Sequence, residues 1–252
     1  MLRLALLLLC LPFLASAHDV QLVSQYVDLG KAGGRGIQED LIGRVDLNRK
    51  WKVGLQGTYL ERFDLYEKRA GGSVQYRPTD TLTVEARYLQ GMGNDILAEK
   101  DGYLAAYYAL APGYSPYFIY RHAAYSVTDI DTYQLGLEIE KIRNIILIPQ
   151  VLLGNATFKA PNETKGVYSV GLRAVYYEES NYSLFAFGYK GKEASQGIIG
   201  KSSILVDTTT FGGGAGYNFT PSTKAELIFD HTDYEELKNQ FMTTTLNLVW
   251  VI

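Results

Sequence analysis

Three histidines are the side chains of this sequence that are best suited to acid–base chemistry: His18, His122 and His231. A hydrolase would need a nucleophile within hydrogen-bond reach of such a base. Ser126 follows His122 by four residues, so the two could share a face of one strand, but at that spacing they lie too far apart for a direct hydrogen bond. Asp230 and His231 are adjacent and would point to opposite faces of a strand. We therefore predict no catalytic residues and an ordinary place for these histidines at strand ends.

Metal and cofactor chemistry has less support still. Cys10 is the one cysteine of the chain, so there is no histidine–cysteine cluster to bind zinc. The acidic group from Asp230 to Glu236 could hold calcium but is more typical of a solvated loop. The glycines at 212–214 lack the lysine and helix of a phosphate loop. We expect no metal and no cofactor, and the balance of 24 basic and 27 acidic residues gives no reason to expect nucleic acid as a partner.

The first 17 residues, MLRLALLLLCLPFLASA, have the pattern of a secretory signal peptide. Arg3 precedes an apolar core, and small residues at 15–17 form the cleavage pattern. The apolar core is too short to cross a bilayer. We expect residues 1–17 to be removed and residues 18–252 to form one domain. Cys10 is removed with the leader, so the mature domain is held together by a large core or by a membrane, without disulfides.

In the segments that would position these side chains, apolar and polar residues alternate with a period of two. The stretch Thr81–Gln90 reads TLTVEARYLQ, in which Leu82, Val84 and Tyr88 alternate with polar residues. The same alternation recurs in many segments of the chain and continues to its end, and no convincing helix interrupts it. The pattern predicts an all-β protein made of half-buried antiparallel strands.

The connections between these strands fall into two alternating classes. Short turns and longer polar loops follow one another strictly, as they do in an up-and-down barrel with one tight rim and one looped rim. Six turns and seven loops imply about 14 strands, although 12 remains possible. The predicted turns are 48–50, 78–80, 111–113, 142–144, 178–181 and 220–222. The predicted loops are 30–36, 61–66, 91–102, 126–131, 155–165, 191–204 and 232–239.

Alternation alone does not decide whether the apolar face meets a protein core or lipid. Many strands look long enough to span the hydrocarbon layer at a tilt, and the last strand carries alternating apolar residues with Trp250 near its end. The chain also has 20 tyrosines, many of them near strand ends, where interfacial belts favour them. We predict an up-and-down antiparallel transmembrane β-barrel in a Gram-negative outer membrane. The belt candidates are Tyr59, Tyr76, Tyr88, Tyr103, Tyr117, Tyr168, Tyr176 and Tyr182.

The polar face of the strands would line the lumen of this barrel. Its mixed charges are typical either of a structural network of ion pairs or of a narrow conduit for a polar solute, and the sequence leaves both open. The residues predicted to line the lumen are Lys52, Gln75, Arg77, Glu85, Arg87, Gln134, Glu138, Arg173, Lys224 and Glu226.

Several motifs resemble one family. Glu61-Arg62-Phe63, the run YSPYFIYRHAAYSVTDIDTYQLGLE at 114–138 and GYKGKE at 188–193 are similar to the YaiO family of outer-membrane β-barrel proteins. The resemblance implies an outer-membrane barrel without an assigned activity, in contact with lipid and lipopolysaccharide. Some relatives are similar to barrels found beside polysaccharide-synthesis machinery, which is a hint that the solute is a polysaccharide.

We therefore expect a non-enzymatic, porin-like envelope barrel for a polar solute or a polysaccharide. Two alternatives remain at this point. One is an outer-membrane hydrolase that uses His122 or His231 at the rim, and the other is a secreted soluble barrel that binds a ligand in its mouth.

Overall fold

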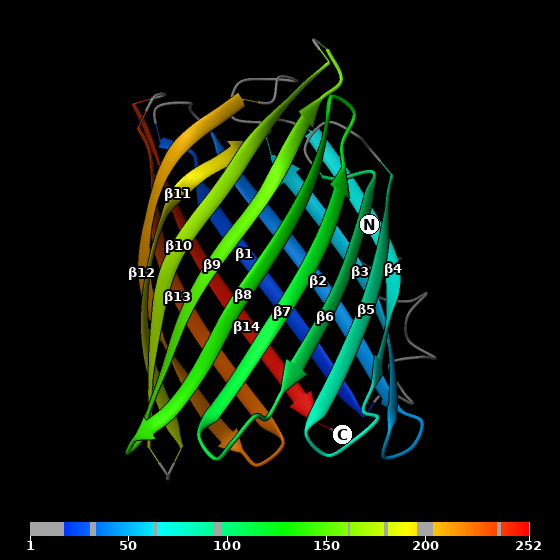
Figure 1. The fold of residues 1–252 in the computed structure, drawn as a ribbon, viewed down its shortest axis with the longest axis vertical. Coiled ribbons are helices and arrows are strands. Elements are labelled where there is room, and N and C mark those ends of the chain that lie inside the picture. Colours follow the sequence, from blue (N-terminus) through cyan, green and yellow to red (C-terminus); the bar gives the residue numbers. More distant parts are fainter. Residues whose placement is uncertain are drawn as a thin grey trace.

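The structure is a computed structural model, and it describes residues 18–30, 34–62, 65–92, 97–160, 162–178, 181–195, 204–235 and 238–251. These residues form fourteen β-strands that wrap into one cylinder (Figure 1). The strands are β1 (Asp19–Asp28), β2 (Arg35–Asp46), β3 (Trp51–Arg62), β4 (Leu65–Tyr76), β5 (Leu82–Met92), β6 (Lys100–Tyr108), β7 (Tyr114–Ala124), β8 (Thr128–Ile142), β9 (Ile145–Phe158), β10 (Glu163–Tyr177), β11 (Tyr182–Ser195), β12 (Ile204–Thr220), β13 (Thr223–Tyr234) and β14 (Asn239–Val251).

The sheet closes on itself. Each strand pairs antiparallel with the next one along the chain, and β1 pairs with β14 from Asp19 opposite Val251 to Asp28 opposite Met242. The prediction of an all-β up-and-down barrel with fourteen strands is confirmed, and the twelve-strand alternative is wrong. Within the described residues, no helix is long and apolar enough to cross a membrane.

Local chemistry explains the tight turns at the end of the barrel where β1 starts and β14 ends, which we call the turn end. Between β2 and β3, the side-chain oxygen of Asn48 accepts hydrogen bonds from the backbone N–H groups of Lys50 (2.8 Å) and Trp51 (3.1 Å). Between β8 and β9, Asn144 has a φ of 62°, a left-handed conformation that asparagine tolerates. Polar turn residues thus replace the ladder hydrogen bonds at the points where the chain reverses.

The connections at the opposite end, the loop end, are shorter than the sequence predicted. The strands run on through most of the predicted loops: β8 begins at Thr128, so that Asp129 and Asp131 lie in a strand. The described strands span 9 to 17 residues, and the longest is β12. The polar residues near the loop end continue the hydrogen-bond ladder, because a paired backbone does not depend on apolar side chains. Polarity alone therefore made most of the predicted loops too long.

The two faces of the sheet differ as the alternation predicted. Residues that pair across neighbouring strands share a face, and every buried strand residue that carries a side chain lies on the same, inward face. The outward face carries large apolar side chains that are about half exposed, such as Leu135 at 53%, Leu172 at 50% and Phe229 at 54%. In a protein without a second sheet over this face, such a continuous apolar surface fits lipid and does not fit water.

Aromatic side chains lie toward both ends of the outward face. Near the turn end, the rings of Trp51 and Tyr76 stack at 4.2 Å between centroids. Nearer the loop end, Tyr120 and Tyr133 lie 5.2 Å apart. Such rings suit the two interfaces of a bilayer, because each ring is apolar and carries a polar edge.

Two of the predicted belt tyrosines lie elsewhere. Tyr103 pairs with Arg121, and Tyr117 lies two residues before Ile119 on the face that also carries Arg121, so both side chains point inward. The prediction that they belong to a belt is wrong. Their segments are aromatic on both faces, and nearness to a strand end does not tell which face a ring occupies.

The alternation of faces makes a testable prediction about stability. Leu246 faces outward, and its neighbour Thr245 faces inward beside Gln25. A lysine at position 246 would place a charge in the hydrocarbon layer at a cost of about 2–4 kcal/mol if the position is near the midplane. We expect Leu246→Lys to lower the free energy of unfolding by that order, measured by urea titration in phospholipid vesicles.

Thr245→Lys is the matched control, because it adds the same charge one residue away on the wet face. It is expected to change the free energy of unfolding by less than half as much. Equal losses in the two variants would contradict lipid as the medium of the outward face.

Candidate functional site

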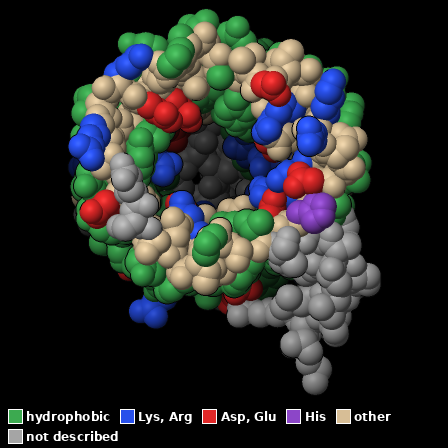
Figure 2. Space-filling model, turned by 90° about the horizontal axis from the view of Figure 1, so that it is seen from below, with side chains coloured by type: hydrophobic (Ala, Val, Ile, Leu, Met, Phe, Trp, Pro, Cys, Tyr) green, Lys and Arg blue, Asp and Glu red, His purple; other side chains and the backbone are tan. Residues whose placement is uncertain are grey.

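The inward face of the barrel is lined with charged and amide side chains. Seen from the turn end, the molecule is hollow, and Lys, Arg, Asp and Glu side chains surround the opening (Figure 2). The charges come from strands all around the wall, so this lumen is the candidate site.

The structure places nine of the ten residues predicted to line the lumen in strands, on this inward face. Lys52 pairs with Gln75, Gln75 pairs with Glu85, and Glu85 pairs with the fully buried Ala105, which fixes the face of all four. Arg77 follows β4 in the turn, where its backbone N–H donates to the carbonyl of Lys50 at 2.8 Å. The other six inward residues are Arg87, Gln134, Glu138, Arg173, Lys224 and Glu226.

A buried carboxylate organises one side of the lumen wall. Asp101, on β6, is 1% exposed and accepts a hydrogen bond from Arg69 at 2.9 Å. Arg121 donates to the same carboxylate through Nε (3.0 Å) and Nη2 (2.9 Å), in a two-pronged arrangement. Charge-assisted, bidentate pairs of this kind are among the strongest in proteins. The three side chains join β4, β6 and β7 across the inward face.

The network continues from Arg69 toward β2. Its Nε donates to the hydroxyl of Thr58 at 3.2 Å, and that hydroxyl donates to Asp40. Asp40 also accepts hydrogen bonds from Gln38 (2.8 Å) and Gln56 (3.1 Å). The charges here are compensated, so they hold the wall together and add little net field to the lumen.

Similar compensation occurs nearer the turn end. Asp19 accepts hydrogen bonds from Arg44 at 3.0 Å and from Lys52 at 3.1 Å. On β13, Glu226 contacts Lys224 at 2.5 Å and accepts a hydrogen bond from Asn247 at 3.1 Å. In these places the charges of the lumen wall are paired with a neighbouring side chain.

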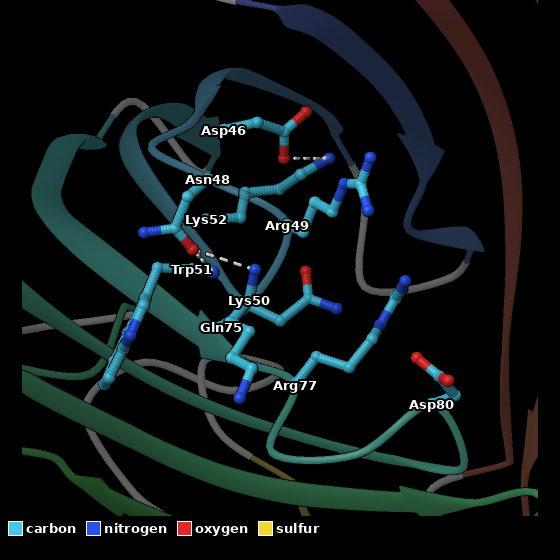
Figure 3. Close-up of a pocket in the computed structure, with 9 residues that line it drawn as sticks. All are labelled: Asp46, Asn48, Arg49, Lys50, Trp51, Lys52, Gln75, Arg77 and Asp80. Carbon is cyan, nitrogen blue, oxygen red and sulfur yellow. Dashed lines mark hydrogen bonds and ion pairs between the residues drawn. The ribbon is translucent and has the colours of Figure 1, made fainter.

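The turn-end mouth differs from this pattern. A hollow of about 610 Å³ lies there between the turns that follow β2 and β4 (Figure 3). Arg49, Lys50 and Arg77 line it, and within the described part of the chain their side chains make no hydrogen bond or ion pair. Of the two acidic residues that line the hollow, Asp46 is paired with Lys52, and the side chain of Asp80 makes no hydrogen bond or ion pair with a described residue. Three cations without ion pairs thus stand against one such carboxylate, so positive charge is in excess at this mouth.

The described residues just before β6 pack against the inward face of the wall. Leu97 and Ala98, which precede β6, are 8% and 2% exposed. The backbone N–H of Leu97 donates to the carboxylate of Glu67, an inward residue of β4, at 2.5 Å. This contact holds the segment against the wall toward the loop end.

His122 and His231 lie outside the lumen. His122 faces outward, and its Nδ1 lies 3.0 Å from Asp131. His231 also faces outward, with Nε2 3.2 Å from Asp233 and its ring 5.0 Å from that of Phe211.

These positions remove the pairings considered from the sequence. Ser126 lies in the connection after β7, so it does not share a strand face with His122. His18 accepts a hydrogen bond from the backbone N–H of Asp46 at 2.8 Å. Among the described residues, no group of three or more His, Cys, Asp or Glu side chains could hold a metal ion.

Sequence reasoning missed several inward side chains that carry much of the wall. Asp101 and Arg121 occupy the inward face in segments where small or aromatic residues obscured the alternation, and Asp40 sits in the irregular run RGIQEDLIGRVD. The register between strands reveals them, because it links Asp101 to Ala123 and so to the inward side.

Comparison with solved structures places this architecture among known barrels. The CymD monoaromatic hydrocarbon channel aligns with a TM-score of 0.64 and 12% identity, over 93% of this chain and 87% of that one. A Pseudomonas aeruginosa FadL homologue aligns with a TM-score of 0.61 and 9% identity, over 93% and 90%. A bacterial polysaccharide outer membrane secretin aligns with a TM-score of 0.59 and 9% identity, over 94% and 99%.

The chain has the fold of an outer-membrane β-barrel. The prediction of a barrel of the Gram-negative outer-membrane type is thereby confirmed at the level of the fold. No family model matches the sequence, and no curated protein matches it. At these identities the likeness establishes the architecture of the barrel.

The buried carboxylate of this barrel gives a second prediction. Asp101→Ala would leave Arg69 and Arg121 without their shared partner on the inward face. Breaking a buried ion pair by removing one side costs about 3–5 kcal/mol. We expect a loss of that order in the free energy of unfolding, measured by urea titration in detergent micelles.

Asp46→Ala is the control, because Asp46 is 49% exposed and its ion pair with Lys52, at 3.4 Å, is solvated. For this control, the free energy of unfolding is expected to fall by less than about 1 kcal/mol. A loss at Asp101 no larger than this would show that the network does not stabilise the wall.

Proposed function

We propose that this protein is a non-enzymatic, porin-like barrel of the outer membrane through which a polar solute passes. The observation that carries the proposal is the hollow, charged lumen that opens at the turn end (Figure 2). A fourteen-stranded barrel encloses more space than an eight-stranded barrel, whose interior is filled by side chains. It encloses less space than a sixteen-stranded porin, which leaves an aqueous channel. A barrel of this size filters solutes by charge and by narrow passage.

The distribution of charge supports a preference for anions. Paired charges along the wall contribute little net field, whereas Arg49, Lys50 and Arg77 leave a positive excess at the turn-end mouth. A mouth with one sign of charge raises the local concentration of counter-ions before they enter.

A non-catalytic role is supported by the position of the histidines. Both His122 and His231 contact carboxylates on the outward face, on the lipid side of the wall, away from the lumen. A solute in the lumen would be separated from them by the sheet.

The motifs at 114–138 and 188–193 support membership of the YaiO family. Some members of that family are similar to barrels found beside polysaccharide-synthesis machinery, which suggests a polysaccharide as the solute.

The surface outside the lumen suits the membrane. The apolar outward band would contact lipid. Toward the loop end, Lys68, Lys100, Lys190 and Lys192 lie on the outward face above this band. Their charges suit the phosphate groups of lipopolysaccharide, which we propose as the neighbouring lipid.

Electrical recording tests this function. We expect the refolded barrel to give discrete conductance steps in planar bilayers and to be more permeable to chloride than to potassium. Arg49→Gln/Arg77→Gln should lower the anion-to-cation permeability ratio roughly twofold, because it removes most of the unpaired charge at the mouth. The ratio is read from the reversal potential in a KCl gradient.

Arg143→Gln is the matched control, since Arg143 is exposed in the turn between β8 and β9 and does not line this hollow. It should leave the ratio unchanged. A refolded barrel that conducts no current would refute the channel function.

A further inference from the structure

Aromatic rings gather on one side of the lumen. They come from β6, β7 and β11, all face inward, and all are half-buried, so one side of each remains accessible. We call this set the aromatic floor: Tyr103, Tyr107, Tyr117, Phe187 and Tyr189.

The two central rings of the floor lie flat against the wall. Tyr117 pairs across the sheet with Gly136, and Tyr189 pairs with Gly171. At either glycine an added Cβ would collide with the tyrosine ring, so each ring occupies the space that a side chain would otherwise fill. A ring that covers the wall with one face turns its other face to the lumen.

Amide groups lie between these two rings. Gln150 pairs with Gly136 on one side and with Gly171 on the other. Its side-chain oxygen accepts hydrogen bonds from the hydroxyl of Tyr117 at 2.9 Å and from the amide of Gln134 at 3.1 Å. The floor therefore alternates ring faces with hydrogen-bonding groups.

The remaining rings extend the floor to both sides. The hydroxyl groups of Tyr103 and Tyr107 lie 2.9 Å apart, and the ring of Tyr107 lies 6.0 Å from that of Tyr117. On the far side, Phe187 lies 5.5 Å from Tyr189. The floor thus crosses several neighbouring strands, a width that suits a ligand of more than one ring.

Two guanidinium groups lie beside the rings of the floor. Arg87 lies 4.8 Å over the ring of Tyr103, and Arg173, which pairs with Phe187, lies 4.6 Å over the ring of Phe185. Neither has a hydrogen bond or ion pair with any described residue, and the Nε of each is buried without a partner. Carboxylates act on these two cations only through longer-range electrostatics, Asp101 on Arg87 and Glu138 and Glu226 on Arg173. Both guanidinium groups can therefore still donate hydrogen bonds to a carboxylate of a ligand.

We propose that the aromatic floor binds an acidic oligosaccharide, with its pyranose rings on the tyrosines and its carboxylates at Arg87 and Arg173. One face of a pyranose consists of C–H bonds, which are attracted to the negative face of an aromatic ring. Its hydroxyl groups can bond to amides such as those of Gln134 and Gln150. A guanidinium matches a carboxylate in shape and charge. The inference rests on the proposed function, because it names the solute class for the same lumen.

Equilibrium binding tests this inference without depending on conduction. The probes are hexagalacturonate, an acidic pyranose oligomer, and maltohexaose, a neutral one, titrated into the refolded barrel in detergent by isothermal titration calorimetry. We expect hexagalacturonate to bind more tightly than maltohexaose. Tyr117→Ala/Tyr189→Ala should weaken the binding of both probes at least tenfold.

Variants that keep the ring separate stacking from loss of structure. Tyr117→Phe/Tyr189→Phe retains both rings over their glycines and should bind within about threefold of the native protein. Tyr133→Ala/Tyr168→Ala removes two outward tyrosines, which are 47% and 50% exposed, and should leave binding unchanged. Heat-modifiable mobility in gels confirms that each variant is folded.

A separate variant tests the role of Arg87 and Arg173 by comparing the affinities of the two probes. Arg87→Gln/Arg173→Gln should reduce the affinity for hexagalacturonate to that for maltohexaose and leave the affinity for maltohexaose unaltered. An equal loss for both probes would assign these arginines to the structure of the wall and overturn their role in binding.

The inference and the proposed function fail in different ways. A barrel that conducts but binds neither probe would overturn the inference and leave the channel function standing. Binding that survives the loss of Tyr117 and Tyr189 in a folded barrel would show that these two rings only cover their glycines. Binding without conductance would support the inference and refute passage.

Discussion

The closure of the sheet is the constraint on which the rest of this structure depends. In hydrocarbon no water is available to bond an unpaired N–H or C=O group, so every strand in the membrane needs a neighbour on both sides. The pairing of β1 with β14 supplies the last of these neighbours. Near the loop end, Gly30 supports this seam with a φ of 56° and a close approach to the backbone of Gln240, where a Cβ would collide.

In a closed membrane barrel, the usual distribution of apolar and polar side chains between interior and surface is reversed. Because the apolar side chains face outward, the inward face must hold the polar ones, and their charges need partners there. Asp101 meets this need by binding Arg69 and Arg121, and Asp19 by binding Arg44 and Lys52. Against this background, the cations without partners are informative. Arg49, Lys50 and Arg77 lie at the turn-end mouth, and Arg87 and Arg173 lie beside the aromatic floor.

The tyrosines show how one residue type serves two environments in the same wall. On the outward face, rings such as Tyr120 and Tyr133 suit the membrane interface because their polar edges reach water. On the inward face, Tyr117 and Tyr189 fill the space above glycines and present a flat surface to the lumen. The difference lies in the strand face that each position occupies.

The sequence by itself determined the all-β class, the alternation of faces and the positions of the six tight turns, and it indicated about fourteen strands with twelve still possible; the closed sheet decided for fourteen. These features are local, because a period of two and turn residues such as Asn48 are visible in a short window. The tertiary structure alone decided what meets across the lumen. Register brings Gly136 under Tyr117 and Asp101 beside Arg121, and neither contact follows from spacing along one strand. Long-range pairing therefore set the site, while local chemistry set the scaffold.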